Sequence, residues 1–153
     1  MEKIPVEIRD KIRNLRMEFK DQPQPELLIP IPNNTPYIPY TVRTTYPEFT
    51  SLCPLTFYQP DFGTITIEYG PEEWVVELKS LKFYLVSFRN VEIFHEQVPV
   101  TILQDLKRVI SPYWIKVTGE FTVRGGIQTT VSSEVRRNTG LEWVKEGRRT
   151  NRG

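Results

Sequence analysis

The residues of this chain best suited to chemistry lie between residues 51 and 96. Cys53 and His95, the only cysteine and the only histidine among 153 residues, both lie in this stretch. Asp61 lies eight residues after the cysteine, and Glu96 directly follows the histidine. A thiol can act as a nucleophile, and a carboxylic acid or an imidazole can supply a proton. Together these residues could therefore carry out covalent catalysis.

Taken singly, each of these residues also has an ordinary structural interpretation. Free cysteine is among the most buried residue types, and a lone aspartate before a strand is typical of a turn. Pro54 favours an extended backbone at Cys53, and loops often carry reactive groups. Lys79 and Lys82 are three residues apart at a predicted helix start and could hold phosphate groups, although a solvated pair is more common.

Composition predicts a soluble, single-domain protein. The chain is 39% hydrophobic and 25% charged, with a net charge of +1, so no strong field draws it to nucleic acid or to membranes. It has no apolar run of the ~20 residues that a membrane helix needs, and its first residues lack the apolar core of a signal peptide. One cysteine cannot form an internal disulfide, which favours the cytoplasm, and one cysteine with one histidine disfavours a zinc site.

The first third of the chain is expected to lie outside the main domain. Residues 6–20 have apolar side chains at helical spacing, which predicts an amphipathic helix packed on the body or on a partner chain. Seven of the 13 prolines lie in residues 21–47, so this stretch is expected to be an extended arm without a helix or a central strand. We therefore divide the chain into a helix and proline-rich arm over 1–47, a central domain over 48–135 and a basic tail over 136–153.

The central domain contains both strand and helix patterns. Alternating apolar residues predict strands, and apolar residues three or four apart predict helices. The expected elements are strands at 63–69 and 74–77, helices at 81–90 and 99–110, and strands at 113–123 and 127–133. Gly125 and Gly126 are expected in a hairpin turn. This ββααββ order predicts an α+β fold, an antiparallel four-stranded sheet with two helices on one face, whose edges could pair between subunits.

The motifs of the central domain resemble those of the NADPH-dependent 7-cyano-7-deazaguanine reductases of the short unimodular type. These are nitrile reductases of queuosine biosynthesis with the tunnelling fold. The resemblance covers residues 48–135, and six segments occur in the family's order. The matching segments are FTSLCP at 49–54, QPDF at 59–62, ELKSLKFY at 77–84, SFRN at 87–90, FHE at 94–96 and RGG at 124–126.

This resemblance implies a role for each reactive residue. Cys53 is similar to the nucleophile that adds to the nitrile carbon and forms a covalent thioimide. Asp61 is similar to the general acid that protonates the nitrogen, and His95 to a residue that assists proton transfer or orientation. Glu96 resembles the carboxylate that accepts hydrogen bonds from the deazaguanine, and Phe94 is expected to stack on its ring.

Further binding residues follow from the same resemblance. Val76, Glu77 and Leu78 match a segment that lines the base pocket. His95 is also expected to contact the substrate there. The residues that resemble groups holding the phosphates of NADPH, the implied cofactor, are Lys79, Lys82 and Arg124. The implied partners are the 7-cyano-7-deazaguanine substrate and further copies of the chain, in a homo-oligomer with active sites between subunits. We expect no metal, no direct contact with nucleic acid and no membrane contact.

Two features depart from the family pattern. The family usually has a single glycine where this chain has Phe57-Tyr58, so the loop from Cys53 to Asp61 is one residue longer and a local bulge is expected. Residues 1–22 have no counterpart in the usual short form.

Three alternative functions were weighed against the reductase. One is a tunnelling-fold amidinotransferase that acts on the same nitrile in tRNA and needs no hydride. Lys79 and Lys82, within an intact motif, and the near-neutral charge argue against it. A zinc-dependent cyclohydrolase of the same fold is disfavoured by the shortage of ligands, and a non-catalytic binding module by the joint presence of the four reactive residues.

Overall fold

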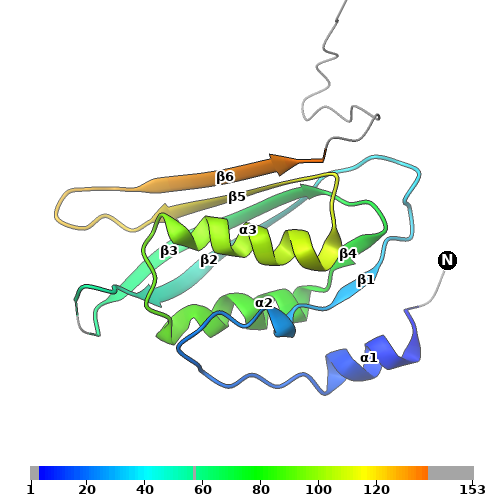
Figure 1. Cartoon of the computed structure of the whole chain (residues 1–153), viewed down its shortest axis with the longest axis horizontal. Coiled ribbons are helices and arrows are strands. Elements are labelled where there is room, and N and C mark those ends of the chain that lie inside the picture. The colour runs from blue at the N-terminus through cyan, green and yellow to red at the C-terminus, as the bar shows by residue number, and fades with distance from the viewer. Residues whose placement is uncertain (1–3, 57, 138–153) are drawn as a thin grey trace, which may run out of the picture.

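A four-stranded antiparallel sheet forms the body of the protein in the computed structural model, which describes residues 4–56 and 58–137 (Figure 1). The order of its strands is β2-β3-β5-β6. The strands are β2 (Val42–Leu52), β3 (Pro60–Gly70), β5 (Trp114–Phe121) and β6 (Thr130–Arg136). Neighbouring strands all run antiparallel. The α+β class and the antiparallel sheet are therefore as expected.

Two helices cover one face of this sheet, and no helix of the described residues lies on the other face (Figure 1). They are α2 (Leu78–Val86) and α3 (Gln97–Ile110), and a 3-10 turn, η2 (Ser87–Asn90), extends α2. The apolar stripe of α3 includes Ile102 and Leu106, both fully buried. These side chains belong to the same apolar cluster as Ile67 of β3 and Val117 of β5. The core therefore lies between the sheet and the two helices, as apolar alternation in strands and helical spacing in helices require.

One strand of the main sheet was assigned to the wrong segment of the sequence. The segment predicted as a strand at 74–77 contains β4 (Trp74–Val76), which pairs with β1 (Pro30–Pro32) in a separate two-stranded sheet. Its expected place in the main sheet is taken by β2 (Val42–Leu52). The prediction that residues 21–47 form an extended surface arm is therefore wrong at β1 and over 42–47, which belong to sheets. Both strands are edge strands, so the stretch contains no central strand, as expected.

A proline within β2 explains why the sequence did not indicate this strand, and the position of the strand in the sheet explains why the proline is tolerated. Pro47 lies in an edge strand, where a missing N–H need not cost a ladder hydrogen bond. The register between β2 and β3 shifts between Tyr46 and Phe49, so the strand is irregular at this proline. The first half of the strand alternates between half-buried and exposed positions, but Thr44 and Thr45 occupy one of each, so the residue types show little apolar alternation.

The remaining elements agree with the sequence in kind and differ in their bounds. Helix α1 (Val6–Arg13) is shorter than the predicted 6–20, and its residues are exposed or half-buried. Helix α2 begins three residues early because the side chain of Glu77 caps its first turn. The hairpin turn is confirmed, since Gly125 and Gly126 have φ of +56° and +80°. A further 3-10 turn, η1 (Pro25–Leu27), lies in the arm, and most of the basic tail, 138–153, lies outside the described residues.

Candidate active site

The hairpin of β2 and β3 brings Cys53 and Asp61 together. Ser51 pairs with Asp61 across the two strands, and Leu52 pairs with Pro60. The N–H of Cys53 donates to the carbonyl of Gln59 over 3.0 Å, which extends the ladder by one residue. Because side chains alternate along a strand, Cys53 follows Ser51 on the side where Asp61 lies, as its diagonal neighbour. Strand register thus places a thiol beside a carboxyl group.

The longer loop does not disturb this arrangement. The N–H of Gln59 donates to the carbonyl of Thr56 over 3.1 Å, and Tyr58 adopts a left-handed conformation with φ of 57°. Tyr58 is also exposed, whereas Phe57 lies outside the described residues. The extra residue is therefore accommodated in the loop, and the pairing of Ser51 with Asp61 is kept.

A second backbone contact positions the histidine beside Asp61. The segment 91–93 runs parallel to the end of β2: the N–H of Leu52 donates to Val91 over 2.9 Å, and the N–H of Ile93 donates to Leu52 over 3.1 Å. Two residues further on, Nε2 of His95 lies 3.2 Å from Oδ2 of Asp61. Residues separated by more than 40 positions in the sequence thus form one cluster.

A phenylalanine that the sequence analysis did not single out supports the histidine. The ring of Phe121, in β5, stacks on the ring of His95 with centroids 3.9 Å apart and planes 2° apart. Two glycines leave room for it. A Cβ at Gly63 would lie 2.9 Å from the carbonyl oxygen of Glu120 and 3.0 Å from the Phe121 ring, and one at Gly119 would lie 2.9 Å from that ring. The stacking of Phe121 on His95 can be inferred only from the pairing of Gly63 with Phe121 across the sheet.

The carboxylate of Asp61 is the centre of the cluster. Its side chain is only 3% exposed, and the guanidinium of Arg124 donates to Oδ1. Among the described residues, Oγ of Ser51 and Nε2 of His95 are buried and lack an aligned hydrogen-bond partner. Buried polar groups are normally satisfied. The cluster therefore offers polar atoms that a substrate or a water molecule can pair with.

The surroundings of Cys53 favour its reactive form. The thiol is half-buried. Hydrogen bonds from the backbone of Leu55 and the side chain of Thr56 lower the pKa of Cys53 below its ordinary value, against the opposing charge of Asp61. A thiolate is the nucleophilic form of cysteine. The loop after β2 therefore prepares Cys53 for attack.

Phe94 and Glu96, which flank the histidine, point outward. Phe94 is 43% exposed and Glu96 is exposed. Glu96 also lines a hollow of about 420 Å³ beside the start of α3, to which residues 21–23 of the arm contribute. The N-terminal extension therefore reaches the surface around the predicted substrate carboxylate.

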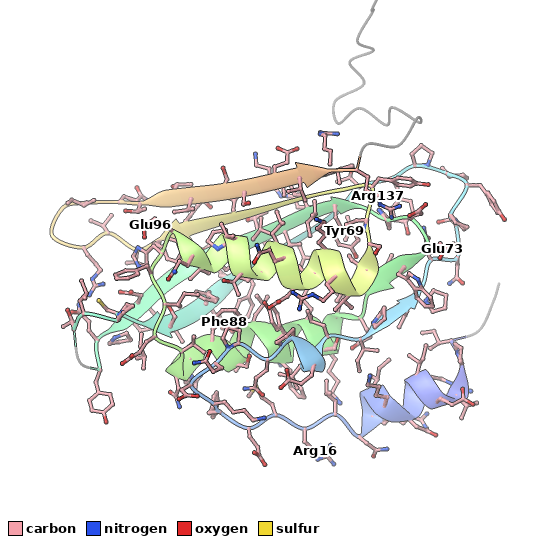
Figure 2. All side chains as sticks on the ribbon, viewed as in Figure 1. Arg16, Tyr69, Glu73, Phe88, Glu96 and Arg137 are labelled. Carbon is pink, nitrogen blue, oxygen red and sulfur yellow. The ribbon has the colours of Figure 1, made fainter. Side chains whose placement is uncertain are left out.

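The other predicted base-pocket residues lie far from Cys53 within one chain. The N–H of Val76 donates to the hydroxyl of Tyr69, at the far end of β3 from Asp61. Eight residues of strand separate Asp61 from Tyr69, or about 26 Å. Figure 2 shows the same separation, with Glu96 and Glu73 towards opposite ends of the molecule. The side chain of Glu77 is itself occupied as the cap of α2, accepting from Lys79 and Ser80.

Two of the three predicted phosphate-binding residues already have partners. Nζ of Lys79 donates to the carbonyl of Ile12, at the end of α1, over 2.9 Å. Arg124 is paired with Asp61, and Lys82 is exposed. All three carry the charge that phosphate needs, so the residue types fit such a ligand. Within residues 4–56 and 58–137, no three carboxylate, imidazole or thiol side chains gather as metal ligands, and no helix is long and apolar enough to cross a membrane.

This sheet and cluster define a tunnelling-fold protein with a cysteine, an aspartate and a histidine at one end of the sheet. The chain belongs to the QueF-like protein family, whose sequence model matches residues 60–139. A protein of Thermomicrobium roseum is 50% identical over 107 residues, which cover 70% of this chain and 83% of that protein. A protein of Chloroherpeton thalassium is 49% identical over 110 residues, covering 72% and 94%. Both are named NADPH-dependent 7-cyano-7-deazaguanine reductase.

A solved structure shares the architecture. It is the apo form of the archaeosine synthase QueF-Like, with a TM-score of 0.57 and 29% sequence identity. The match covers 61% of this chain and 91% of that one. The tunnelling fold expected from the resemblance is thus supported by this neighbour.

The reactivity of Cys53 should depend on Thr56 and Asp61 in opposite directions. Thr56→Val removes a hydrogen bond to the thiolate, so the pH midpoint of iodoacetamide labelling should rise by up to about one unit. Asp61→Asn removes the opposing charge and should lower that midpoint. Because Cys53 is the only cysteine, total labelling reports on it alone. Thr45→Val, on the exposed part of β2, is the control, and equal midpoints in all four proteins would contradict this account.

Proposed function

We propose that this protein reduces the nitrile of 7-cyano-7-deazaguanine to the 7-aminomethyl compound with NADPH. The observation that carries the proposal is the convergence of Cys53, Asp61 and His95 at one end of the sheet. The names of the relatives at about 50% identity support the substrate and the cofactor. We also propose that the enzyme acts in the cytoplasm and that residues 48–135 form its catalytic domain.

The chemistry assigned to these side chains begins with covalent addition. The sulfur of Cys53 bonds to the nitrile carbon, one carbon–nitrogen π bond breaks, and the nitrogen takes up a proton, which gives a thioimide. A nitrile is weakly electrophilic, so nucleophile and acid must act together. Asp61 supplies the proton, and His95, held against Phe121, lies at hydrogen-bond distance from it to relay the next one. NADPH supplies the hydride, and conversion to the amine requires two in turn.

The separation of the predicted binding residues supports an active site shared between copies of the chain. Cys53 and the 76–78 segment lie near opposite ends of β3, a distance several times the length of a bicyclic base. If both contact one substrate, they come from different subunits. The outer edges of β2 and β6 pair with no further strand in the part of the chain that the structure describes, and they provide surfaces on which copies can join. We therefore propose a homo-oligomer in which a neighbour buries Glu96 and Phe94 around the base.

A second candidate keeps the thioimide but not the hydride. The likeness to an archaeosine synthase favours it as an alternative, because that protein shares this fold at 29% identity. In the amidinotransferase alternative, an amine rather than hydride would attack the thioimide, and the substrate would be tRNA. The relatives with higher identity favour the reductase, and consumption of the dinucleotide separates the two.

Turnover should oxidise two NADPH for each nitrile consumed. Loss of absorbance near 340 nm measures the dinucleotide, and chromatography measures the amine. Cys53→Ala should lower the rate by about a thousandfold or more, because without the thiol the addition step is lost. Thr45→Val should keep the wild-type rate. A wild-type protein that binds the nitrile and leaves NADPH unchanged would exclude the reductase.

Two inactive variants should restore activity when they assemble together. Cys53→Ala removes the nucleophile, and Leu78→Arg places a charge on an exposed side chain of the predicted base pocket. In mixed oligomers formed from equal amounts, about a quarter of the shared sites would contain two intact halves. The expected activity is therefore about a quarter of the wild-type value. Activity that stays at the level of the separate variants would show that each site is built from one chain.

A further inference from the structure

Arg124 makes a contact that its predicted role with phosphate does not explain. Its guanidinium donates to Oδ1 of Asp61 from the turn between β5 and β6. Oδ2 of the same carboxylate lies 3.2 Å from Nε2 of His95. Burial of a carboxylate is costly unless it is paired, and Asp61 is 3% exposed. In this structure, Arg124 is therefore the counter-ion of Asp61.

This contact opposes the reaction proposed for Asp61. A carboxyl group must carry a proton before it can give one to the nitrile nitrogen. A guanidinium at hydrogen-bond distance stabilises the ionised carboxylate. The other charged or titratable groups that face Asp61 are His95, from the segment before α3, and Cys53, from the end of β2. Among these groups, Arg124 is the permanent cation, and its guanidinium donates to the carboxylate.

The surroundings of Arg124 let it move without unpacking the core. Its side chain is 35% exposed, and two backbone hydrogen bonds of 2.9 Å between Arg124 and Ile127 close the turn. A Cβ at Gly125 or at Gly126 would meet nothing within 4 Å, so the turn is open on both glycines. An anion that approaches this turn can therefore compete with Asp61 for the guanidinium.

We propose that Arg124 is a positioning residue that couples anion binding to proton delivery by Asp61. While Arg124 contacts Oδ1, the side chain of Asp61 stays paired and aligned beside Cys53. When a phosphate group takes the guanidinium, Asp61 takes up one proton from solvent and passes it to the nitrile nitrogen. Transfer of the proton to the nitrile nitrogen rests on the proposed function. The role of Arg124 as counter-ion of Asp61 involves only side chains of this chain and does not depend on that function.

The protonation of Asp61 can be followed directly without substrate. The chain has four aspartates, so carbon-13 labelling of their carboxyl groups gives four NMR signals, and Asp61→Asn identifies one of them. In Arg124→Gln the pH midpoint of that signal should rise by about one unit or more, because a nearby cation is lost. Arg124→Lys should keep the midpoint near the wild-type value. Arg108→Gln, which removes a cation that pairs with Asp105 instead, is the control and should leave it unchanged.

The wild-type chain tests the coupling without any variant. Sodium pyrophosphate at constant ionic strength should raise the midpoint of Asp61 in the wild-type protein and leave that of Arg124→Gln where it is. No rise in the wild-type protein, or equal midpoints in Arg124→Gln and Arg108→Gln, would overturn the proposal.

The pH dependence of adduct formation separates this proposal from the proposed function. With the nitrile and no dinucleotide, covalent modification of Arg124→Gln should persist to higher pH than that of the wild-type protein. The difference in pH should equal the difference between the NMR midpoints of Asp61 in the two proteins. If the NMR midpoints shift and no protein forms an adduct, the counter-ion role stands and the proposed reaction fails. If adducts form and the midpoints coincide, the reaction stands and the role of Arg124 fails.

Discussion

The parallel pairing of residues 91–93 with the end of β2 is the constraint on which the site depends. Leu52 makes both hydrogen bonds of this contact, one to Val91 and one from Ile93. It fixes where His95 emerges relative to Cys53 and Asp61, which the β2–β3 hairpin has already placed together. A slip of one residue would turn the alternating side chains to the other face and take the imidazole away from the carboxylate. The two hydrogen bonds of Leu52 thus align three reactive groups from two segments.

The buried carboxylate at this junction links the remaining parts of the site. Asp61 is shared between Arg124 on one oxygen and His95 on the other, and its charge also opposes formation of the Cys53 thiolate. A change in the protonation of one group therefore alters the others. Ser51 and His95 each retain a buried polar atom without an aligned partner among the described residues, as expected of a site that awaits a ligand.

The sequence predicted the class of fold better than the arrangement of the strands. Cys53, Asp61 and His95 were found from motif order, and the apolar spacing of α3 and the two glycines of the hairpin were predictable from local chemistry. Strand β2 was not predicted because Pro47 lies within it and because the residue types of its first half show little apolar alternation. The stacking of Phe121 on His95 and the pairing of Arg124 with Asp61 join residues more than 20 positions apart, so only the sheet register reveals them. The roles assigned by resemblance to Val76, Leu78 and Lys82 stay predictions.

Intact-protein mass spectrometry tests the central claim most directly. Protein mixed with 7-cyano-7-deazaguanine and sodium pyrophosphate, without NADPH, should gain the mass of one substrate per chain, because addition to the nitrile expels nothing. The added mass should map to the peptide that contains Cys53 and be absent from Cys53→Ala. A wild-type protein that binds the nitrile without any gain in mass, or an equal gain in Cys53→Ala, would contradict covalent addition at Cys53.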